Sequence, residues 1–392
     1  MNRIRGKNVS SSRAETAMSL KKVFIATGIA FAAAAAQSAD VSIYGIVDMG
    51  LLIRNTASIE GAAGTLAESK TSVGVESGQY YPNTFGLKGE EDLGNGLKAG
   101  FMLENTFNSD TGAMFEEGSF FNNQSVLYLE KSGYMFAMGR MKALTSTMGY
   151  FDYGAFMEPF EGSWRNAGSS VLAMIGQDVR NAVALDMHPS DSIRITGMYS
   201  LAQGETEETT YSSNRHYMGL AASYSQGGLW AAVSYEHITQ GHEGAEYYDG
   251  NEAHVAKFAV NYDFGPVRPF FVYSFANGYD WGWEGPAVKT HSFVLGATSP
   301  VAGGTARFSV QYLKGSSEKA DDGKDFEPEV VSAAIGYTYP LSKRTTFYSV
   351  ASYAFGSKSL DKDWDSDYSM AGLDGRQNAN AAMVSLGLMH TF

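Results

Sequence analysis

The feature that most constrains this chain is the sorting of its connections into two kinds that alternate along the sequence. Sixteen segments with strand character follow one another from residue 41 to residue 392. Seven of the connections between them are short turns of the hairpin type, and eight are long and polar. Transmembrane β-barrels are built in this way, with short turns at one end and long loops at the other. A soluble sandwich has no reason to sort its loops by length.

The predicted strands are regularly spaced. They cover residues 41–54, 83–92, 97–108, 124–130, 134–140, 177–186, 192–201, 217–225, 229–238, 253–264, 267–275, 289–298, 305–313, 328–339, 344–355 and 380–392. The long connections between them cover residues 55–82, 109–123, 141–176, 202–216, 239–252, 276–288, 314–327 and 356–379.

Strict alternation of apolar and polar residues gives several of these strands two unlike faces. Residues 253–264 and 305–313 show it clearly, and in the second segment Phe308 and Val310 alternate with polar residues such as Arg307. In a soluble sandwich the apolar face packs on another sheet, whereas in a membrane barrel it faces lipid and the polar face lines water. Unpaired backbone groups are not tolerated in lipid, so the first strand must pair with the last.

Composition excludes several other classes of protein. Charged residues are only 18%, mean hydropathy is −0.20, and no apolar run reaches the length of about 18 residues that a membrane helix needs. The chain has 29 Lys and Arg against 42 Asp and Glu, so a nucleic-acid binder is not expected. The absence of cysteine from the sequence excludes disulfides, thiolate zinc sites and cysteine nucleophiles.

The first 39 residues are predicted to be a secretory signal peptide, and residues 1–17 are interpreted as an extended start before Met18. Lys21 and Lys22 precede an apolar stretch over 23–36, and small residues suitable for signal peptidase follow. The mature chain is then a single domain over residues 40–392. We expect it to be exported through the periplasm to the outer membrane.

Four segments resemble the trimeric porins of Gram-negative bacteria, in particular the beta-proteobacterial type. They are Val41-Ser-Ile-Tyr-Gly-Ile-Val-Asp48, Phe85-Gly-Leu-Lys-Gly-Glu-Glu-Asp-Leu-Gly-Asn-Gly-Leu-Lys98, Gly139-Arg140 and Gly387-Leu-Met-His-Thr-Phe392. The resemblance implies an all-β, 16-stranded antiparallel transmembrane barrel, a homotrimer, and a third loop folded into the lumen. It also implies that Phe392 is an assembly signal, recognised by the outer-membrane assembly machinery.

The third long connection, 141–176, is therefore the expected pore constriction. It carries Asp152, Glu158 and Glu161, and Glu158-Pro-Phe-Glu-Gly162 is similar to an acidic signature on the inward loop of the family. Carboxylates at a constriction face basic residues on the opposite wall and select ions by charge. The first candidates for the basic wall are Lys88 and Arg140. Arg180, Arg194 and Arg307 are further candidates, and among these Arg307 has the clearest place in an alternating strand. The family often has Arg before Phe-Gly-Leu-Lys-Gly, where this chain has Thr84.

The resulting hypothesis is a water-filled channel for passive diffusion of ions and small hydrophilic solutes, with a mild cation preference. We expect no enzymatic activity and no cofactor. We also expect no metal motif, because His237 and His242 are spaced too far apart for their rings to converge. Acidic clusters in the external loops are interpreted either as loose Ca²⁺ or Mg²⁺ sites near lipopolysaccharide or as a solvated surface. The alternative functions are a substrate-selective porin and a barrel that acts mainly as a surface adhesin.

Overall fold

The structure is a computed structural model that describes residues 40–60, 65–161, 172, 178–203, 214–239, 252–279, 288–317, 327, 329–357 and 379–392. The predicted signal peptide lies outside these residues. So do the acidic clusters at 205–208, 243–252, 321–325 and 361–367, to which the Ca²⁺ or Mg²⁺ interpretation refers, except for Glu252, which the structure describes.

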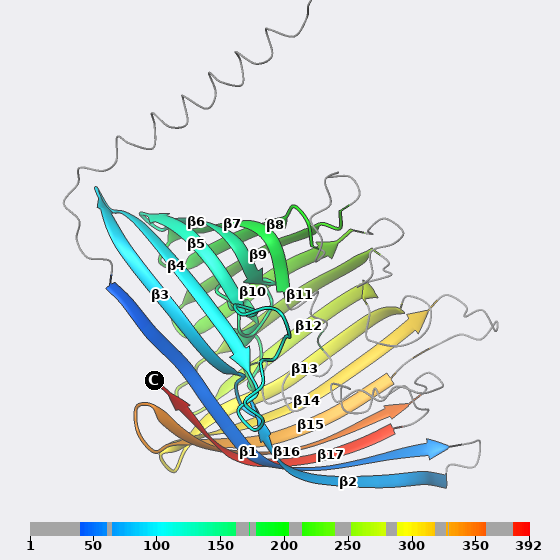
Figure 1. Ribbon diagram of the computed structural model, residues 1–392. Coiled ribbons are helices and arrows are strands. Elements are labelled where there is room, and N and C mark those ends of the chain that lie inside the picture. The colour runs from blue at the N-terminus through cyan, green and yellow to red at the C-terminus, as the bar shows by residue number, and fades with distance from the viewer. Residues whose placement is uncertain are drawn as a thin grey trace, which may run out of the picture.

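The described residues form one sheet whose strands run antiparallel to their neighbours (Figure 1). The strands are β1 (Asp40–Glu60), β2 (Thr65–Ser77), β3 (Asn83–Gly94), β4 (Leu97–Phe107), β5 (Gln124–Lys131), β6 (Tyr134–Lys142), β7 (Asp178–Ser190), β8 (Ile193–Ser200), β9 (Tyr217–Gln226), β10 (Leu229–Ile238), β11 (Ala253–Tyr262), β12 (Arg268–Tyr279), β13 (Val288–Val301), β14 (Gly304–Ser317), β15 (Glu329–Pro340), β16 (Thr345–Ser357) and β17 (Ala379–Thr391).

The sheet closes on itself because the first strand pairs with the last. The register of β1 on β17 runs from Ile46 opposite Thr391 to Ser58 opposite Ala379. Closure removes the unpaired edge that a sheet cannot have in lipid. The predicted antiparallel barrel with a seam between the two ends of the chain is therefore confirmed.

The first hairpin differs from its prediction. The first strand extends to Glu60 rather than ending at residue 54, and residues 65–77 of the predicted loop over 55–82 form the additional strand β2. Both β2 and β3 lie on the same side of β1: β3 pairs with its first residues and β2 with its last. The two strands therefore occupy one position in the wall, and the seventeen described strands form a barrel of sixteen positions.

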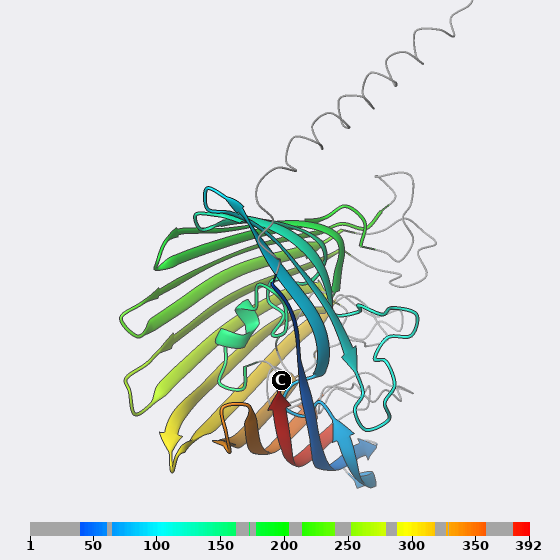
Figure 2. The same cartoon turned by 60° about the vertical axis from the view of Figure 1, so that its left-hand side comes forward.

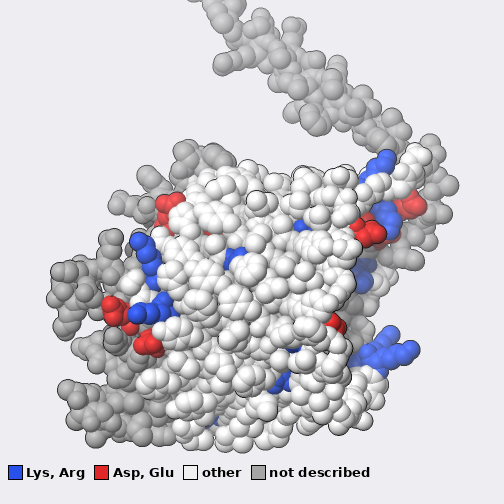
Figure 3. Space-filling view, turned by 180° about the vertical axis from the view of Figure 1, so that it is seen from behind, with Lys and Arg blue, Asp and Glu red and all other residues white. Residues whose placement is uncertain are grey.

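The distribution of side chains across the wall is the inverse of that in a soluble protein. In β14, Arg307, Ser309 and Gln311 are buried on the inner face, whereas Phe308 and Val310 are exposed on the outer face. Figure 3 shows one side of this outer surface, on which charged residues gather toward the edges and few lie between them. An apolar outer band with a polar interior is the pattern of a transmembrane barrel, so the predicted fold class is confirmed.

Short turns join the strands at the end of the barrel where β1 begins and β17 ends. In the turn between β9 and β10, Gly227 and Gly228 both have positive φ angles, 60° and 87°. Two-residue hairpins of type I′ require this conformation at both positions. Across the described ranges, helical structure is confined to a single turn, η1 (Tyr153–Phe156), so no helix there is long and apolar enough to cross a membrane.

Candidate functional site: an inward loop that narrows the barrel

After β6 the chain leaves the wall and enters the barrel, where η1 lies within the ring of strands (Figure 2). We call residues 143–161 the inward loop. Its apolar side chains are almost completely buried, among them Leu144, Phe151, Met157 and Phe160. The predicted third loop folded into the lumen is thus present.

The start of the inward loop is held by a buried polar cluster on β9, β10 and β11. The backbone N–H of Leu144 donates to the Tyr217 hydroxyl at 3.2 Å, and that hydroxyl donates to Glu236 Oε1 at 2.7 Å. Lys257 Nζ donates to Thr145 Oγ1 at 2.8 Å, and the same hydroxyl donates to Glu236. Lys257 and Glu236, which carry opposite charges, thus both hydrogen-bond to Thr145. These bonds fix the loop where it leaves β6.

Arg194 on β8 holds the middle of the inward loop. Its Nη1 donates to the carbonyl of Phe151 at 3.0 Å, and its guanidinium lies 5.1 Å from the ring centre of Tyr153. Its Nε donates to Asp186 Oδ1 at 2.9 Å, which orients the side chain toward the loop. On β11, which β9 and β10 separate from β8, Asn261 donates to the carbonyl of Phe156 at 2.9 Å. These contacts connect η1 and the residues beside it to β8 and β11.

Arg307 on β14 holds the tip of the inward loop. Its two terminal nitrogens donate to the carbonyl of Pro159 and, at 2.8 Å, to Glu161 Oε1. The other oxygen of Glu161 accepts hydrogen bonds from the hydroxyls of Tyr80 at 3.1 Å and Tyr81 at 2.9 Å. A carboxylate with three donors is strongly localised, so the loop tip spans the barrel from β14 to the break between β2 and β3.

Two glycines in the wall leave room for the tip of the loop. A Cβ atom at Gly296 on β13 would lie 2.6 Å from Pro159, and one at Gly336 on β15 would lie 2.8 Å from the ring of Phe160. Any larger residue at either position would therefore push the loop away from the wall.

The break between β2 and β3, residues 78–82, is organised by Asp48 on β1. Its two carboxylate oxygens accept hydrogen bonds from the backbone N–H groups of Gln79, Tyr80 and Tyr81, at 3.0, 3.1 and 3.0 Å. The hydroxyl of Tyr348 on β16 donates to the same carboxylate at 2.7 Å. Asp48 thereby presents the two tyrosine rings to Glu161.

The three acids predicted for the constriction lie in different environments. Glu161 is partly exposed beside Arg307, whereas Glu158 is buried and accepts a hydrogen bond from the backbone N–H of Phe160 at 2.8 Å. Asp152 has a left-handed backbone with φ 54°. Burial raises the pKa of the Asp152 carboxyl to about 7, although nearby Arg194 lowers it. Desolvation opposes ionisation here more than the cation supports it.

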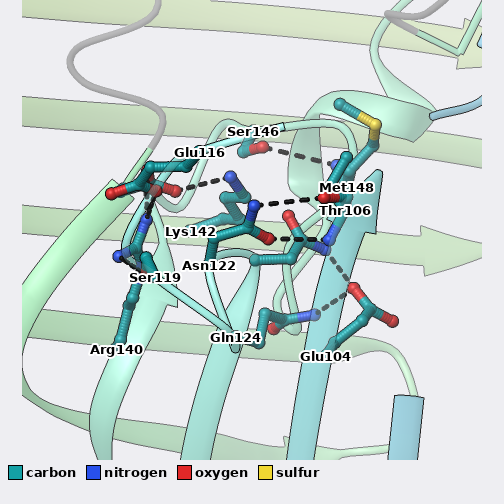
Figure 4. Close-up of polar contacts among 12 residues, drawn as sticks. Glu104, Thr106, Glu116, Ser119, Asn122, Gln124, Arg140, Lys142, Ser146 and Met148 are labelled. Atoms are coloured by element: carbon teal, nitrogen blue, oxygen red, sulfur yellow. Dashed lines mark hydrogen bonds and ion pairs between the residues drawn. The ribbon is translucent and has the colours of Figure 1, made fainter. Parts of the chain in front are cut away.

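The basic residues predicted for the wall separate into three places. Arg307 contacts Glu161, as described above. Arg140 instead binds Glu116 of the second long connection at 2.6 Å (Figure 4). Arg180 binds the same carboxylate at 2.8 Å. Arg140 also binds Asp178 at 2.8 Å. These contacts are with acids outside residues 143–161, and the role of the two arginines as a basic wall opposite the inward loop stays a prediction.

The local backbone explains the position of Arg140. Gly139 has a φ of 132°, and the pairing of β6 with β7 shifts register between Gly139 and Met141. A β-bulge of this kind re-aims the next side chain. A Cβ atom at Gly139 would lie 2.0 Å from the carbonyl oxygen of Ser125, so only glycine fits there.

Lys88 lies on β3 and is exposed, with its ammonium 5.1 Å from the ring centre of Tyr44. Its contact is thus with a neighbouring strand of the same wall. At the other end of the chain, the backbone N–H of Phe392 donates to the carbonyl of Gly45 at 3.1 Å, and the carbonyl of Phe392 accepts from the N–H of Gly45 at 3.3 Å. The terminal residue is therefore hydrogen-bonded into the barrel seam.

Sequence reasoning missed several residues that hold the inward loop. Lys257 and Asn261 were recognisable as members of the polar face of 253–264. Glu236 and Tyr217 carry no comparable signal, because their role depends on contacts with a loop about 70 to 90 residues away. Tyr217 in particular occupies a strand end, where an aromatic residue suggests a membrane interface, yet it is buried inside the barrel.

Comparisons with known proteins agree with this architecture. The family model for Gram-negative porins matches residues 25–359. An outer membrane porin protein of Bordetella pertussis is 24% identical over 95% of this chain and 100% of its own length. Outer membrane porin protein 32 of Delftia acidovorans is 28% identical over 84% of this chain and 88% of its own length.

Solved structures share the fold. The anion-selective porin from Comamonas acidovorans superposes with a TM-score of 0.64, at 21% identity, over 91% of this chain and all of that one. A trimer form of the outer membrane protein OmpT of Vibrio cholerae superposes with a TM-score of 0.56, at 14% identity, over 91% and 100% of the two chains. This chain belongs to the Gram-negative porin family and is a channel of the outer membrane rather than an enzyme.

Proposed function

We propose that this porin passes ions and small hydrophilic solutes by passive diffusion, with a mild preference for cations at the inward loop. The observation that carries this proposal is the charge of the loop itself. Residues 143–161 contain Asp152, Glu158 and Glu161 and no Lys or Arg. The cations that neutralise the loop come from the wall.

Exposure decides which of these charges a passing ion meets. The side chain of Glu161 is 30% exposed, whereas that of its partner Arg307 is 9% exposed. Lys257 is buried beneath Thr145. At the tip of the loop the carboxylate of Glu161 is thus the more accessible charge. Charges within a Debye length of about 8 Å at physiological salt act on ions in the pore, so the exposed acid favours cations.

The test is the reversal potential of the purified channel in a planar bilayer under a KCl gradient. We expect K⁺ to be favoured over Cl⁻, and Glu161→Gln to reduce this preference. Glu329→Gln is the matched control, because Glu329 accepts a hydrogen bond from Tyr312 on another part of the wall and lies away from the inward loop. Clear chloride selectivity of the native channel would contradict the proposal.

The solute range is tested separately by the swelling of liposomes in sugars of graded size. A diffusion channel gives rates that fall smoothly with solute size. Saturation of the conductance by a single solute would instead favour a substrate-selective porin. Unchanged solute flux after deletion of the external loops would leave those loops available for an adhesin role.

We also propose that the chain assembles as a homotrimer in lipid and lipopolysaccharide, and that Phe392 is read by the outer-membrane assembly machinery. The supporting observations are the trimeric form of the Vibrio cholerae relative and the hydrogen-bonded position of Phe392 in the seam. Chemical cross-linking of the detergent-purified channel is expected to stop at three chains. Deletion of Phe392 is expected to lower the amount of assembled barrel in the outer membrane while refolding in detergent continues.

A further inference from the structure

Two histidines and one glutamate meet where the long connection between β10 and β11 begins and ends. His237 near the end of β10 and His254 near the start of β11 are directly opposite each other in the strand pairing. Their rings are stacked, with centres 4.3 Å apart and planes inclined by 15°. Glu252 precedes β11 by one residue. The relevant partner of His237 is thus a cross-strand residue, which spacing along the sequence does not reveal.

The three side chains converge on one point. Glu252 Oε1 lies 3.3 Å from His237 Nε2 and 3.4 Å from His254 Nε2. All three ligand atoms lie within 4.8 Å of one another. A tetrahedral Zn²⁺ with bonds of about 2.0–2.1 Å separates its ligand atoms by about 3.3 Å. Both measured N–O separations match the edge of such a tetrahedron.

Hydrogen bonds to the other ring nitrogens orient both imidazoles. His237 Nδ1 lies 3.1 Å from the carbonyl oxygen of Ala253, which only accepts, so this nitrogen carries the hydrogen. His254 Nδ1 lies 2.7 Å from the Tyr235 hydroxyl. Metal-binding histidines are held in this way by a carbonyl or another polar group on the nitrogen away from the metal.

The two imidazole nitrogens and the carboxylate oxygen can share one cation between them. With its hydrogen on Nδ1, the neutral imidazole of His237 directs a lone pair from Nε2 toward the oxygen of Glu252. One divalent ion accepts all three lone pairs and leaves both rings neutral.

We propose that His237, Glu252 and His254 form a binding site for a divalent transition-metal ion, with Zn²⁺ as the best match to the donor set. Two imidazoles and one carboxylate suit Zn²⁺ far better than Ca²⁺ or Mg²⁺, which prefer oxygen ligands. The Glu252 side chain is 57% exposed, so the ion enters from solvent, and the His237 side chain is only 8% exposed. The bound ion joins the ends of β10 and β11 across their long connection.

The experiment is a titration of the refolded full-length channel in detergent with ZnCl₂, in competition with a chromophoric chelator. We expect one saturable site per chain. Glu252→Gln and His254→Gln are each expected to weaken binding at least tenfold, and Tyr235→Phe to weaken it about tenfold through the loss of the orienting hydroxyl. The matched control is His291→Gln, because Tyr273 binds His291 Nδ1 at 2.8 Å in the same way but without a second histidine.

Heat-modifiable migration on gels and single-channel conductance show whether each variant has folded. Glu252 lies outside the strands and is exposed, so E252Q tests the site even if a histidine variant fails to fold. Zn²⁺ affinity that is unchanged in E252Q, or a native channel that shows no saturable Zn²⁺ binding, would overturn the proposal. Equal losses in E252Q and His291→Gln would overturn it as well.

Discussion

The titration of Asp152 gives the most specific prediction for the pore. Burial raises the pKa of this carboxyl to about 7, with Arg194 opposing the shift and Glu161 adding to it. A raised pKa means that the carboxyl is neutral below about pH 7 and negative above it. At that pKa the ionised fraction is about 10% at pH 6 and about 90% at pH 8. The inward loop therefore gains most of one negative charge over this interval.

The size of the effect follows from Coulomb's law. A unit charge about 8 Å from the ion path, in water, contributes about 0.5 kcal/mol, and screening over one Debye length reduces it to roughly 0.2 kcal/mol. Because K⁺ and Cl⁻ respond with opposite signs, their permeability ratio changes by about 0.4 kcal/mol, which is about twofold. We therefore expect cation preference to rise about twofold between pH 6 and pH 8.

The assay is the reversal potential of single channels in a KCl gradient at pH 6, 7 and 8. Asp152→Asn should remove the pH step, whereas Glu161→Gln should lower cation preference at every pH and keep the step. The comparison of the native channel with D152N isolates the contribution of this aspartate. The reasoning is refuted if the native permeability ratio is flat with pH, or if the step survives in D152N.

Three further predictions concern the loop and its supports. Arg307→Leu removes two charge-assisted hydrogen bonds worth about 1.5–3 kcal/mol each, and we expect a noisier and larger single-channel conductance as the loop tip detaches. Gly336→Val should displace the loop and change conductance, whereas Gly197→Ala, which adds a Cβ in open space, should leave it unaltered. Asp48→Ala leaves four donors without their acceptor, so we expect a loss of several kcal/mol in unfolding by urea. Asp263→Asn at an exposed ion pair should cost much less, and equal losses for the two aspartates would contradict the role given to Asp48.

The strands were predictable because their signal is local. Alternation over 253–264 or 305–313 depends on side chains within a single strand, and the structure places strands there. Residues 65–77 escaped prediction because alternation is limited to their last part, where Val73 and Val75 face outward. Their strand conformation comes from pairing with β1, which the sequence of the segment does not encode on its own.

A residue of the candidate site was predictable only where its type and its place on one face of a strand were enough to identify it. Arg307 stood out because it is a charged residue on the polar face of a clearly alternating strand, and it contacts the inward loop. Arg140 follows a glycine at a bulge, and a shift of one residue in register sends its side chain to Glu116 instead. The contact of Glu161 with Tyr80 and Tyr81 joins residues about 80 positions apart, and pairings of that kind arise from closure of the barrel rather than from local sequence.

The hydrogen bond from Tyr348 to Asp48 has a consequence for biogenesis. Tyr348 belongs to β16, among the last strands to be synthesised, whereas Asp48 lies in the first strand and orients the tyrosines that receive the tip of the inward loop. A barrel whose final strands have not yet paired therefore lacks the hydrogen bond from Tyr348 to Asp48, which stabilises the break between β2 and β3 that contacts the loop tip. The position of the inward loop, and with it the width of the pore, is therefore fixed only after the two ends of the polypeptide have paired.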